Sequence, residues 1–303
     1  MNSVANLIPY LPPSLSALIT SLSTALKQSL CEVRLRRDLP LSFSTYGETF
    51  FLSSSGKRCR VNEAMRSTQY DMEFLLGNLC EGSVYRHMST MREGYLITKE
   101  GIRAGICGEG IYKEGILSAM GDCYSVNLRL PHDIPGIADS LLGFFSQPRS
   151  VLIISPPGVG KTTLLRDFTL RVSAGDAGRP LRVALVDERR EILPPGSPCF
   201  CRGGLIDLLS GYAKADGMEI ATRTLSPELI VCDEIGSQED ISAILAVQNS
   251  GVPLVATAHG SSYAELLRRP PMKTLLDYKV FSMIFILSKE NGALKTTCQE
   301  VAV

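Results

Sequence analysis

Hydrophobic positions in the first half of the chain change their spacing several times. Residues 14–30 place leucine and isoleucine at helical spacing, and residues 31–36 then alternate apolar with charged side chains, which predicts a helix followed by a strand. A short hairpin is expected between residues 46 and 61, and residues 62–91 are expected to be helical with one interruption. Together these patterns indicate a region that mixes helices with strands.

Residues 94–115 are punctuated by six glycines that separate short runs of other residues. This spacing is typical of short antiparallel strands joined by tight turns, although a glycine-rich loop that binds nothing has the same spacing. Gly105, Gly108 and Gly110 do not form a dinucleotide-binding fingerprint, because their spacing runs in the wrong order and no ten-residue helical pattern follows them.

The pattern changes again after a turn cluster at residues 133–136, which places a domain boundary near residue 132. Beyond it, continuous apolar runs alternate with helical patterns. The expected strands span residues 151–155, 182–188, 228–234 and 253–259. The expected helices span residues 160–172, 206–212, 214–225, 238–249 and 262–267.

This alternation predicts an α/β fold for residues 133–303, in which helices cover both faces of a parallel sheet. Residues 280–288 and 296–303 are expected to close the sheet as a hairpin around Asn291. Residues 1–132 are expected to form a smaller α+β domain in front of it.

Composition narrows the class of protein. Hydrophobic residues make up 45% of the 303 positions, which is globular composition, and the 31 basic residues balance the 31 acidic ones. The chain therefore has no net positive charge that would attract it to nucleic acid, and no nucleic-acid partner is expected. Apolar runs are too short to span a bilayer, so any membrane contact would be peripheral.

Nine cysteines and three histidines give little support for a metal site. The nearest approach to a zinc pattern is the Cys199 and Cys201 pair, with few histidines to complete it. Free thiols in a reducing cytoplasm are the better interpretation.

The strongest chemical signal is a strand, a glycine-rich turn and a helix in succession. Such a turn exposes backbone N–H groups where the helix dipole also favours anionic phosphate, which predicts an ATP site. Lys161 would reach the β- and γ-phosphates and Thr162 would bind Mg²⁺. The sequence departs from the usual motif at its first position, where Ser155 replaces glycine. The predicted phosphate loop comprises Ser155, Pro156, Pro157, Gly158, Val159, Gly160, Lys161, Thr162 and Thr163.

A second signal is the apolar run 229–232, which is followed by two acids. A buried strand brings such carboxylates to the sheet edge where the phosphate loop also lies. Asp233 would hold Mg²⁺, and Glu234 would orient or deprotonate the attacking water. An acidic strand end alone is commonly just solvated, but its pairing with a phosphate loop is specific.

Two further strand ends carry polar residues, namely Asp187, Glu188 and Arg189 on one and Thr257 and His259 on the other. Either group could be a solvated cap, or it could sense the γ-phosphate. Spacing alone assigns them no role.

Several motifs in this order resemble the stage III sporulation AA family, a relative of the type II and type IV secretion ATPases in the additional-strand class of P-loop proteins. The likeness also covers residues 83–85, 94–98, 101–105 and 127–130, and so extends over nearly the whole chain. The motifs that carry it are SPPGVGKTTLLRD, DERREI, LSPELIVCDEIG and TAHG.

The resemblance implies an AAA/RecA-like P-loop fold and an ATPase on the mother-cell side of a channel complex that links mother cell and forespore. It also implies a homo-oligomer, a hexameric ring with nucleotide between subunits, and small membrane proteins as partners. The location would be cytoplasmic, at the inner face of a membrane, and residues 1–132 would make the oligomer and partner contacts.

The same resemblance suggests roles at the site. Secretion ATPases carry an acidic box and a histidine box beside the active site, and DERREI and TAHG are similar to these, which would assign Glu188 and His259 to catalysis. The sequence departs from that family at Asp233, where the secretion ATPases carry glycine. Their cysteine-based zinc motif is also missing from this sequence.

Two alternatives stay open at the level of sequence. The basic stretches 34–37 and 57–60 could contact phosphates in a nucleic-acid-dependent ATPase, although short charge runs are usually solvated strand faces. Ser155 in the phosphate loop favours a nucleotide-gated scaffold with little turnover.

Overall fold

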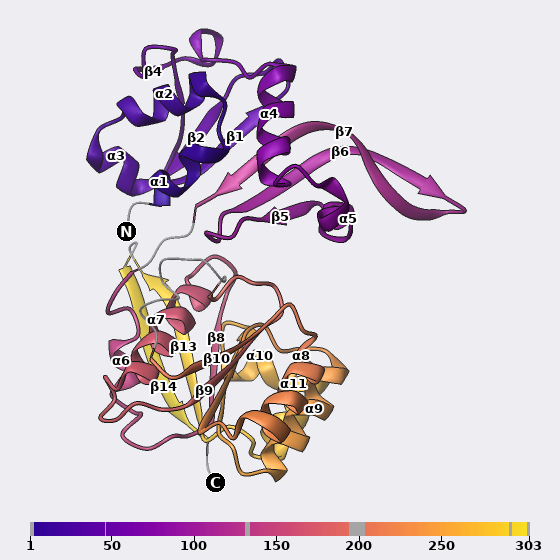
Figure 1. The fold of residues 1–303 in the computed structure, drawn as a ribbon. Helices are drawn as coiled ribbons and strands as arrows, with labels where there is room; N and C mark the ends of the chain where they lie inside the picture. The colour runs from indigo at the N-terminus through magenta and orange to yellow at the C-terminus, as the bar shows by residue number, and fades with distance from the viewer. Residues whose placement is uncertain (1–2, 46, 131–133, 194–203, 291–292, 302–303) are drawn as a thin grey trace. The chain divides into compact units, whose positions relative to one another are not determined.

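The computed structural model describes residues 3–45, 47–130, 134–193, 204–290 and 293–301 (Figure 1). The chain divides into two compact units, Met1–His132 and Asp133–Val303. Several residues used in the sequence predictions lie outside the described ranges: Tyr46, Asp133, Cys199, Cys201, Asn291 and residues 302–303.

Unit 1 is built on an antiparallel sheet with the strand order β4-β3-β2-β1-β7-β6-β5. Its strands are β1 (Leu30–Arg36), β2 (Ser42–Thr45), β3 (Thr49–Leu52), β4 (Arg58–Cys59), β5 (Tyr95–Ile97), β6 (Arg103–Lys113) and β7 (Ile116–Arg129). Its helices are α1 (Ser3–Leu7), α2 (Pro13–Ser21), α3 (Thr24–Ser29), α4 (Gln69–Leu79) and α5 (Val84–Arg92), with short 3-10 turns at Ile8–Tyr10 and Val61–Glu63.

The helix expected over residues 14–30 is in fact two helices, α2 and α3. Ser23 separates them because its side chain accepts a hydrogen bond from the backbone N–H of Leu26 and caps α3. The predicted interruption of residues 62–91 is confirmed, since α4 ends at Leu79 and α5 begins at Val84.

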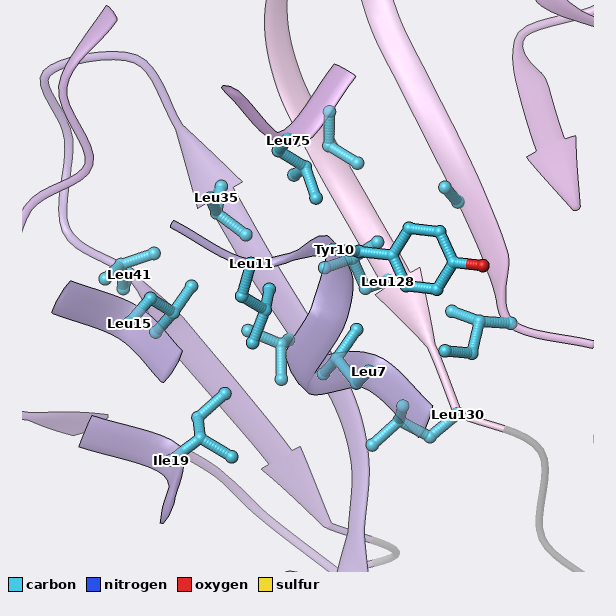
Figure 2. Close-up of a cluster of buried hydrophobic side chains, with 14 of the residues drawn as sticks. Leu7, Tyr10, Leu11, Leu15, Ile19, Leu35, Leu41, Leu75, Leu128 and Leu130 are labelled. Atoms are coloured by element: carbon cyan, nitrogen blue, oxygen red, sulfur yellow. The ribbon is translucent and has the colours of Figure 1, made fainter. Parts of the chain in front are cut away.

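The core of unit 1 lies between its helices and one face of the sheet. Figure 2 shows leucines and Ile19 from the N-terminal helices meeting Leu35 of β1 and Leu128 of β7, all of them buried. On β1 the buried Val33 and Leu35 alternate with half-buried charged residues, which confirms the predicted period of two.

Strands β6 and β7 are longer than the short strands expected from the glycine spacing. They run for 11 and 14 residues and extend as a ribbon beyond the neighbouring strands (Figure 1). Gly101 and Gly115 have positive φ at turns, but Gly108 lies inside β6, where a Cβ would come within 2.3 Å of the Asp122 carbonyl oxygen. Glycine at position 108 therefore permits close approach of two strands and does not end one.

Unit 2 contains a second sheet with the strand order β10-β9-β11-β12-β8-β13-β14. All its strand pairs are parallel except β13 with β14, which form the predicted closing hairpin. The strands are β8 (Val151–Ser155), β9 (Val183–Asp187), β10 (Ile206–Ser210), β11 (Leu229–Cys232), β12 (Leu254–His259), β13 (Met283–Glu290) and β14 (Ala293–Glu300).

Helices cover both faces of this sheet, as predicted (Figure 1). One face packs against α6 (Asp139–Leu142) and α7 (Lys161–Ala174). The other packs against α8 (Lys214–Ile220), a π-helical turn η4 (Ala221–Leu225), α9 (Gln238–Asn249), α10 (Tyr263–Leu267) and α11 (Pro270–Asp277). None of the described helices is long and apolar enough to cross a bilayer.

The helix expected near residues 206–212 is wrong, because residues 206–210 form β10 at the edge of the sheet. Five residues of β10 pair in parallel with β9. A short apolar run such as this one, which ends at Gly211, can form either a helix or a strand, and here the pairing selects the strand. Helix α11 was not among the expected helices. It begins with Pro270 and Pro271, and proline is favoured in the first turn of a helix.

Candidate active site

The predicted site residues follow the carboxyl ends of four parallel strands. Ser155 ends β8, Asp187 ends β9 and His259 ends β12, while Asp233 follows β11 directly. Strand β12 lies between β8 and β11, so His259 is the register partner of Ser155. One edge of the sheet therefore collects the polar groups of four separate segments.

The phosphate loop turns between β8 and the start of α7. Gly158 and Gly160 both have positive φ, at 74° and 120°, which is a backbone conformation that other residues rarely adopt. Gly160 immediately precedes Lys161, the first residue of α7. The turn thus leads directly into the N-terminus of a 14-residue helix, where free N–H groups and the dipole favour an anion.

Lys161 is only 6% exposed, and its ammonium group lies among oxygen and nitrogen acceptors. Its Nζ donates to the carbonyl oxygen of Ser155 at 3.0 Å and lies 3.1 Å from Nδ1 of His259. Burial lowers the pKa of Lys161 below its ordinary value, although the nearby charges of Asp233 and Glu234 act in the opposite direction.

Ser155, the residue that departs from the usual motif, is fully buried at the end of β8. Its hydroxyl donates to the carbonyl oxygen of Pro156 at 2.7 Å and accepts from Nζ of Lys161 at 3.3 Å. Since Ser155 has no positive φ, the backbone at this position does not need glycine.

Asp233 accepts hydrogen bonds from two threonines. Thr162 Oγ1 donates to its Oδ2 at 2.9 Å, and the buried Thr257 donates to its Oδ1. A carboxylate beside a hydroxyl is a donor set that suits Mg²⁺, which usually takes one or two carboxylates together with phosphate and water. Within the described residues no cluster of three acidic, histidine or cysteine side chains could hold a metal by itself.

Glu234 is held by both its backbone and its carboxylate. Its φ of 48° is uncommon for a residue other than glycine, and its N–H donates to Thr257 Oγ1 at 2.8 Å. The carboxylate accepts from Arg189 at 2.5 Å and lies 3.3 Å from Nε2 of His259. His259 therefore touches Lys161 through one ring nitrogen and Glu234 through the other.

The acidic segment after β9 has a different arrangement. Glu188 accepts from Nζ of Lys214 at 2.5 Å and lines the same small hollow as Asp233 and Glu234. The buried Asp187 accepts from the backbone N–H groups of Glu191, Ile192 and Leu193, which shapes the loop.

Burial raises the pKa of Asp187 above its ordinary value, while its backbone hydrogen bonds oppose that shift. Arg166 of α7 donates to the carbonyl oxygens of Ile192 and Glu191, so the phosphate-loop helix also holds this segment.

Two residues of this site, Lys214 and Arg166, could not be recognised from the sequence. Nothing in the spacing connects Lys214 to Glu188, because 26 positions separate them. The position of Arg166 in the sequence indicates only a polar residue of a helix. Thr257 and Arg189 stand in the motifs that the sequence singled out, but their partners could not be assigned from spacing.

The two basic stretches have acidic partners near them. Arg34 pairs with Glu32 at 2.8 Å, and Arg37 lies 3.6 Å from Asp122. Arg58 donates twice to Glu48. These pairings partly neutralise the charge that the nucleic-acid alternative requires.

Comparison with known proteins identifies the relatives of this chain. Residues 10–299 match the family described as sporulation stage III, protein AA. Stage III sporulation protein AA of Bacillus subtilis strain 168 is 33% identical over 297 residues, which cover 96% of this chain and 92% of that protein.

Solved structures of ATPases share the fold. The X-ray structure of the Legionella pneumophila ATPase DotB aligns with a TM-score of 0.58 at 16% identity, over 94% of this chain and 78% of that one. The crystal structure of the pilus retraction motor PilT with bound ADP aligns with a TM-score of 0.62 at 15% identity, over 92% and 81%. The chain therefore belongs to the sporulation stage III protein AA family and has the fold of P-loop ATPases.

Proposed function

We propose that this protein binds and hydrolyses ATP in a Mg²⁺-dependent reaction at the carboxyl edge of the unit 2 sheet. The observation that carries the proposal is the convergence of three segments of the chain, which contribute Lys161 with Thr162, Asp233 with Glu234, and His259, and which short polar contacts link to one another. Loop residues 155–163 would bind the phosphates, with Lys161 as their cation.

Mg²⁺ would be held by Thr162 and Asp233, and it would neutralise charge that develops on the phosphates. Glu234 is the proposed base that orients or deprotonates the attacking water. His259 and Arg189 contact both oxygens of its carboxylate and would fix its direction. Glu188 is proposed to act from the neighbouring hollow, where Lys214 holds it.

The biological role follows from the family. We infer a cytoplasmic ATPase at the mother-cell face of a membrane, which energises or assembles a channel between mother cell and forespore. In this proposal the protein forms a homo-oligomeric, hexameric ring and acts through small membrane proteins. Unit 1 would carry the oligomer and partner contacts.

Substitution of Lys161 tests the site. Lys161→Ala removes the buried cation that would stabilise transferred phosphate, so Mg²⁺-dependent ATP turnover is expected to fall by about 10²- to 10³-fold, as for loss of one preorganised electrostatic contact. Phosphate release and ATP binding are measured on the full chain. Lys295→Ala, an exposed lysine on β14 that pairs with Glu290, is the matched control and should leave both unchanged.

Unchanged turnover in Lys161→Ala would refute the assignment. ATP binding with no turnover in the unaltered protein would instead favour the nucleotide-gated scaffold, in which Ser155 restrains Lys161.

A further inference from the structure

Arg269, at the junction of α10 and α11, reaches the sheet edge that carries the candidate active site. Its Nη1 donates a hydrogen bond to the carbonyl oxygen of His259 at 2.7 Å. A Cβ built at Gly236 would lie 3.1 Å from its Nη2, so the guanidinium also lies against the backbone two residues after Glu234. The side chain therefore lies between the ends of β11 and β12, which carry Glu234 and His259.

The partner of this guanidinium is unusual for an arginine. A guanidinium has several N–H donors and is often matched with a carboxylate. Among the described residues, however, Arg269 makes no ion pair, and its one side-chain hydrogen bond goes to a backbone carbonyl. The side chain therefore holds the backbone beside the site and does not neutralise an acid.

The backbone of Arg269 is fixed on both sides. Its N–H donates to the carbonyl oxygen of Leu266 at 3.0 Å, at the end of α10, and its own carbonyl accepts from the N–H of Lys273 at 2.9 Å, in the first turn of α11. Pro270 follows and restricts the residue before it to extended backbone, which is what Arg269 adopts, with φ −100° and ψ 110°. The guanidinium therefore extends from a rigid base.

The peptide group between His259 and Gly260 is held at both of its polar atoms. Its carbonyl accepts from Arg269, and its N–H donates to the carbonyl oxygen of Ser155 at 3.2 Å. The same Ser155 carbonyl accepts from Nζ of Lys161 at 3.0 Å. Because glycine places few limits on its own backbone, the orientation of this peptide group depends on its two hydrogen bonds.

The direction of the His259 imidazole depends on that peptide group. Nδ1 lies 3.1 Å from Nζ of Lys161, and Nε2 lies 3.3 Å from the Glu234 carboxylate. An ammonium group can only donate, so Nδ1 accepts and Nε2 carries the proton toward Glu234. A ring that turned with its backbone would lose both contacts at once.

We propose that Arg269 is a positioning residue for the proposed ATP hydrolysis. Its guanidinium fixes the His259–Gly260 peptide group and thereby directs the imidazole that links Lys161 to Glu234. Arg269 acts through His259 and does not contact the nucleotide. This role depends on the proposed function, since the direction of the imidazole matters for turnover only if Glu234 acts on water.

Substitution of two neighbouring arginines tests this role. Arg269→Met removes the donors and keeps an unbranched side chain, and kcat for phosphate release is expected to fall by about 10- to 100-fold, because small misplacements of reacting groups cost that much. KM for ATP should stay nearly unchanged, since the phosphate loop is intact. Arg268→Met, at the exposed arginine next to it, is the matched control and should keep both values.

A double variant separates positioning from general support of the fold. If Arg269 acts through His259, adding Arg269→Met to His259→Ala should lower kcat no further than His259→Ala alone. Arg269→Lys keeps a cationic donor and should recover part of the lost kcat. Circular dichroism during heating shows that each variant is folded, and Arg269→Lys takes the place of Arg269→Met if the latter is not.

Histidine NMR tests the contact without nucleotide or turnover. The chain has three histidines, so isotope-labelled histidine rings give few signals, and His259→Ala identifies the signal of His259. That signal should shift in Arg269→Met and stay in place in Arg268→Met.

Two results would overturn the role of Arg269: a His259 signal that does not move in Arg269→Met, or losses of kcat from Arg269→Met and His259→Ala that multiply in the double variant. A shifted signal in a protein that does not hydrolyse ATP would instead retain the contact and refute the proposed function. The two failures are therefore distinguishable.

Discussion

The two sheets of this protein differ in where their polar side chains lie. In unit 2 the parallel strands β8 and β9 are buried along their whole length, so polar chemistry is confined to the strand ends. In the antiparallel sheet of unit 1, β1 buries Val33 and Leu35, and half-buried charged side chains occupy the positions between and beside them. A sheet covered on both faces leaves only its edges for function, whereas a sheet covered on one face offers a surface.

A contrast between buried and exposed positions also occurs along the β6–β7 ribbon of unit 1. Near the core, Val126 and Leu128 of β7 are fully buried, while Ile116 at the far end of the same strand is 71% exposed. In β6 the last seven residues are all exposed. The ribbon therefore holds unit 1 together at one end and offers unburied apolar side chains at the other.

Substitutions at the two ends of β7 would sharpen this comparison most. Leu128→Ala is expected to lower the free energy of unfolding by about 2–5 kcal/mol, because it removes a fully buried side chain and leaves a cavity. Ile116→Ala should change it by less than about 0.5 kcal/mol. Urea denaturation followed by circular dichroism measures both. Equal losses would show that the far end of the ribbon is packed, contrary to its exposure here.

Elements set by local signals could be predicted from the sequence, whereas elements set by tertiary pairing could not. In unit 2, β8 and α9 have the expected bounds, since an uninterrupted apolar run and a Ser237 cap are local signals. Strand β10 was mistaken for a helix because its pairing with β9 decides its state, and each paired residue, such as Val183 for Ile206, lies far back in the sequence. In unit 1 the glycines of β6 were taken for strand ends, since only the Asp122 backbone opposite explains Gly108.

The site shows a similar limit. Motifs pointed to Lys161, Asp233, Glu234 and His259, and the structure brings these residues together. The bridging position of His259 could not be predicted, because it depends on β12 lying next to β8 in the sheet. Contacts such as Glu188 with Lys214 arise from the same tertiary arrangement.

A substitution at Ser155, with a smaller expected effect, tests whether the phosphate loop restrains Lys161. Ser155→Gly removes a hydroxyl that accepts from Nζ of Lys161 while leaving the carbonyl contact at 3.0 Å in place. One hydrogen bond contributes about 1 kcal/mol, so ATP turnover is expected to rise by up to about fivefold. Steady-state phosphate release checks this. A loss of turnover would mean that the Ser155 hydroxyl supports the active arrangement of Lys161.

In the proposed mechanism Glu234 acts on water while other residues bind the nucleotide. Glu234→Gln keeps the size of the side chain but removes its ability to take a proton, so ATP binding should be retained while phosphate release falls by about 10²- to 10⁴-fold. Measuring ATP affinity and phosphate release on the same preparations of both proteins tests this directly. Retained affinity with lost release is the predicted result, and phosphate release equal to that of the unaltered protein would contradict the account.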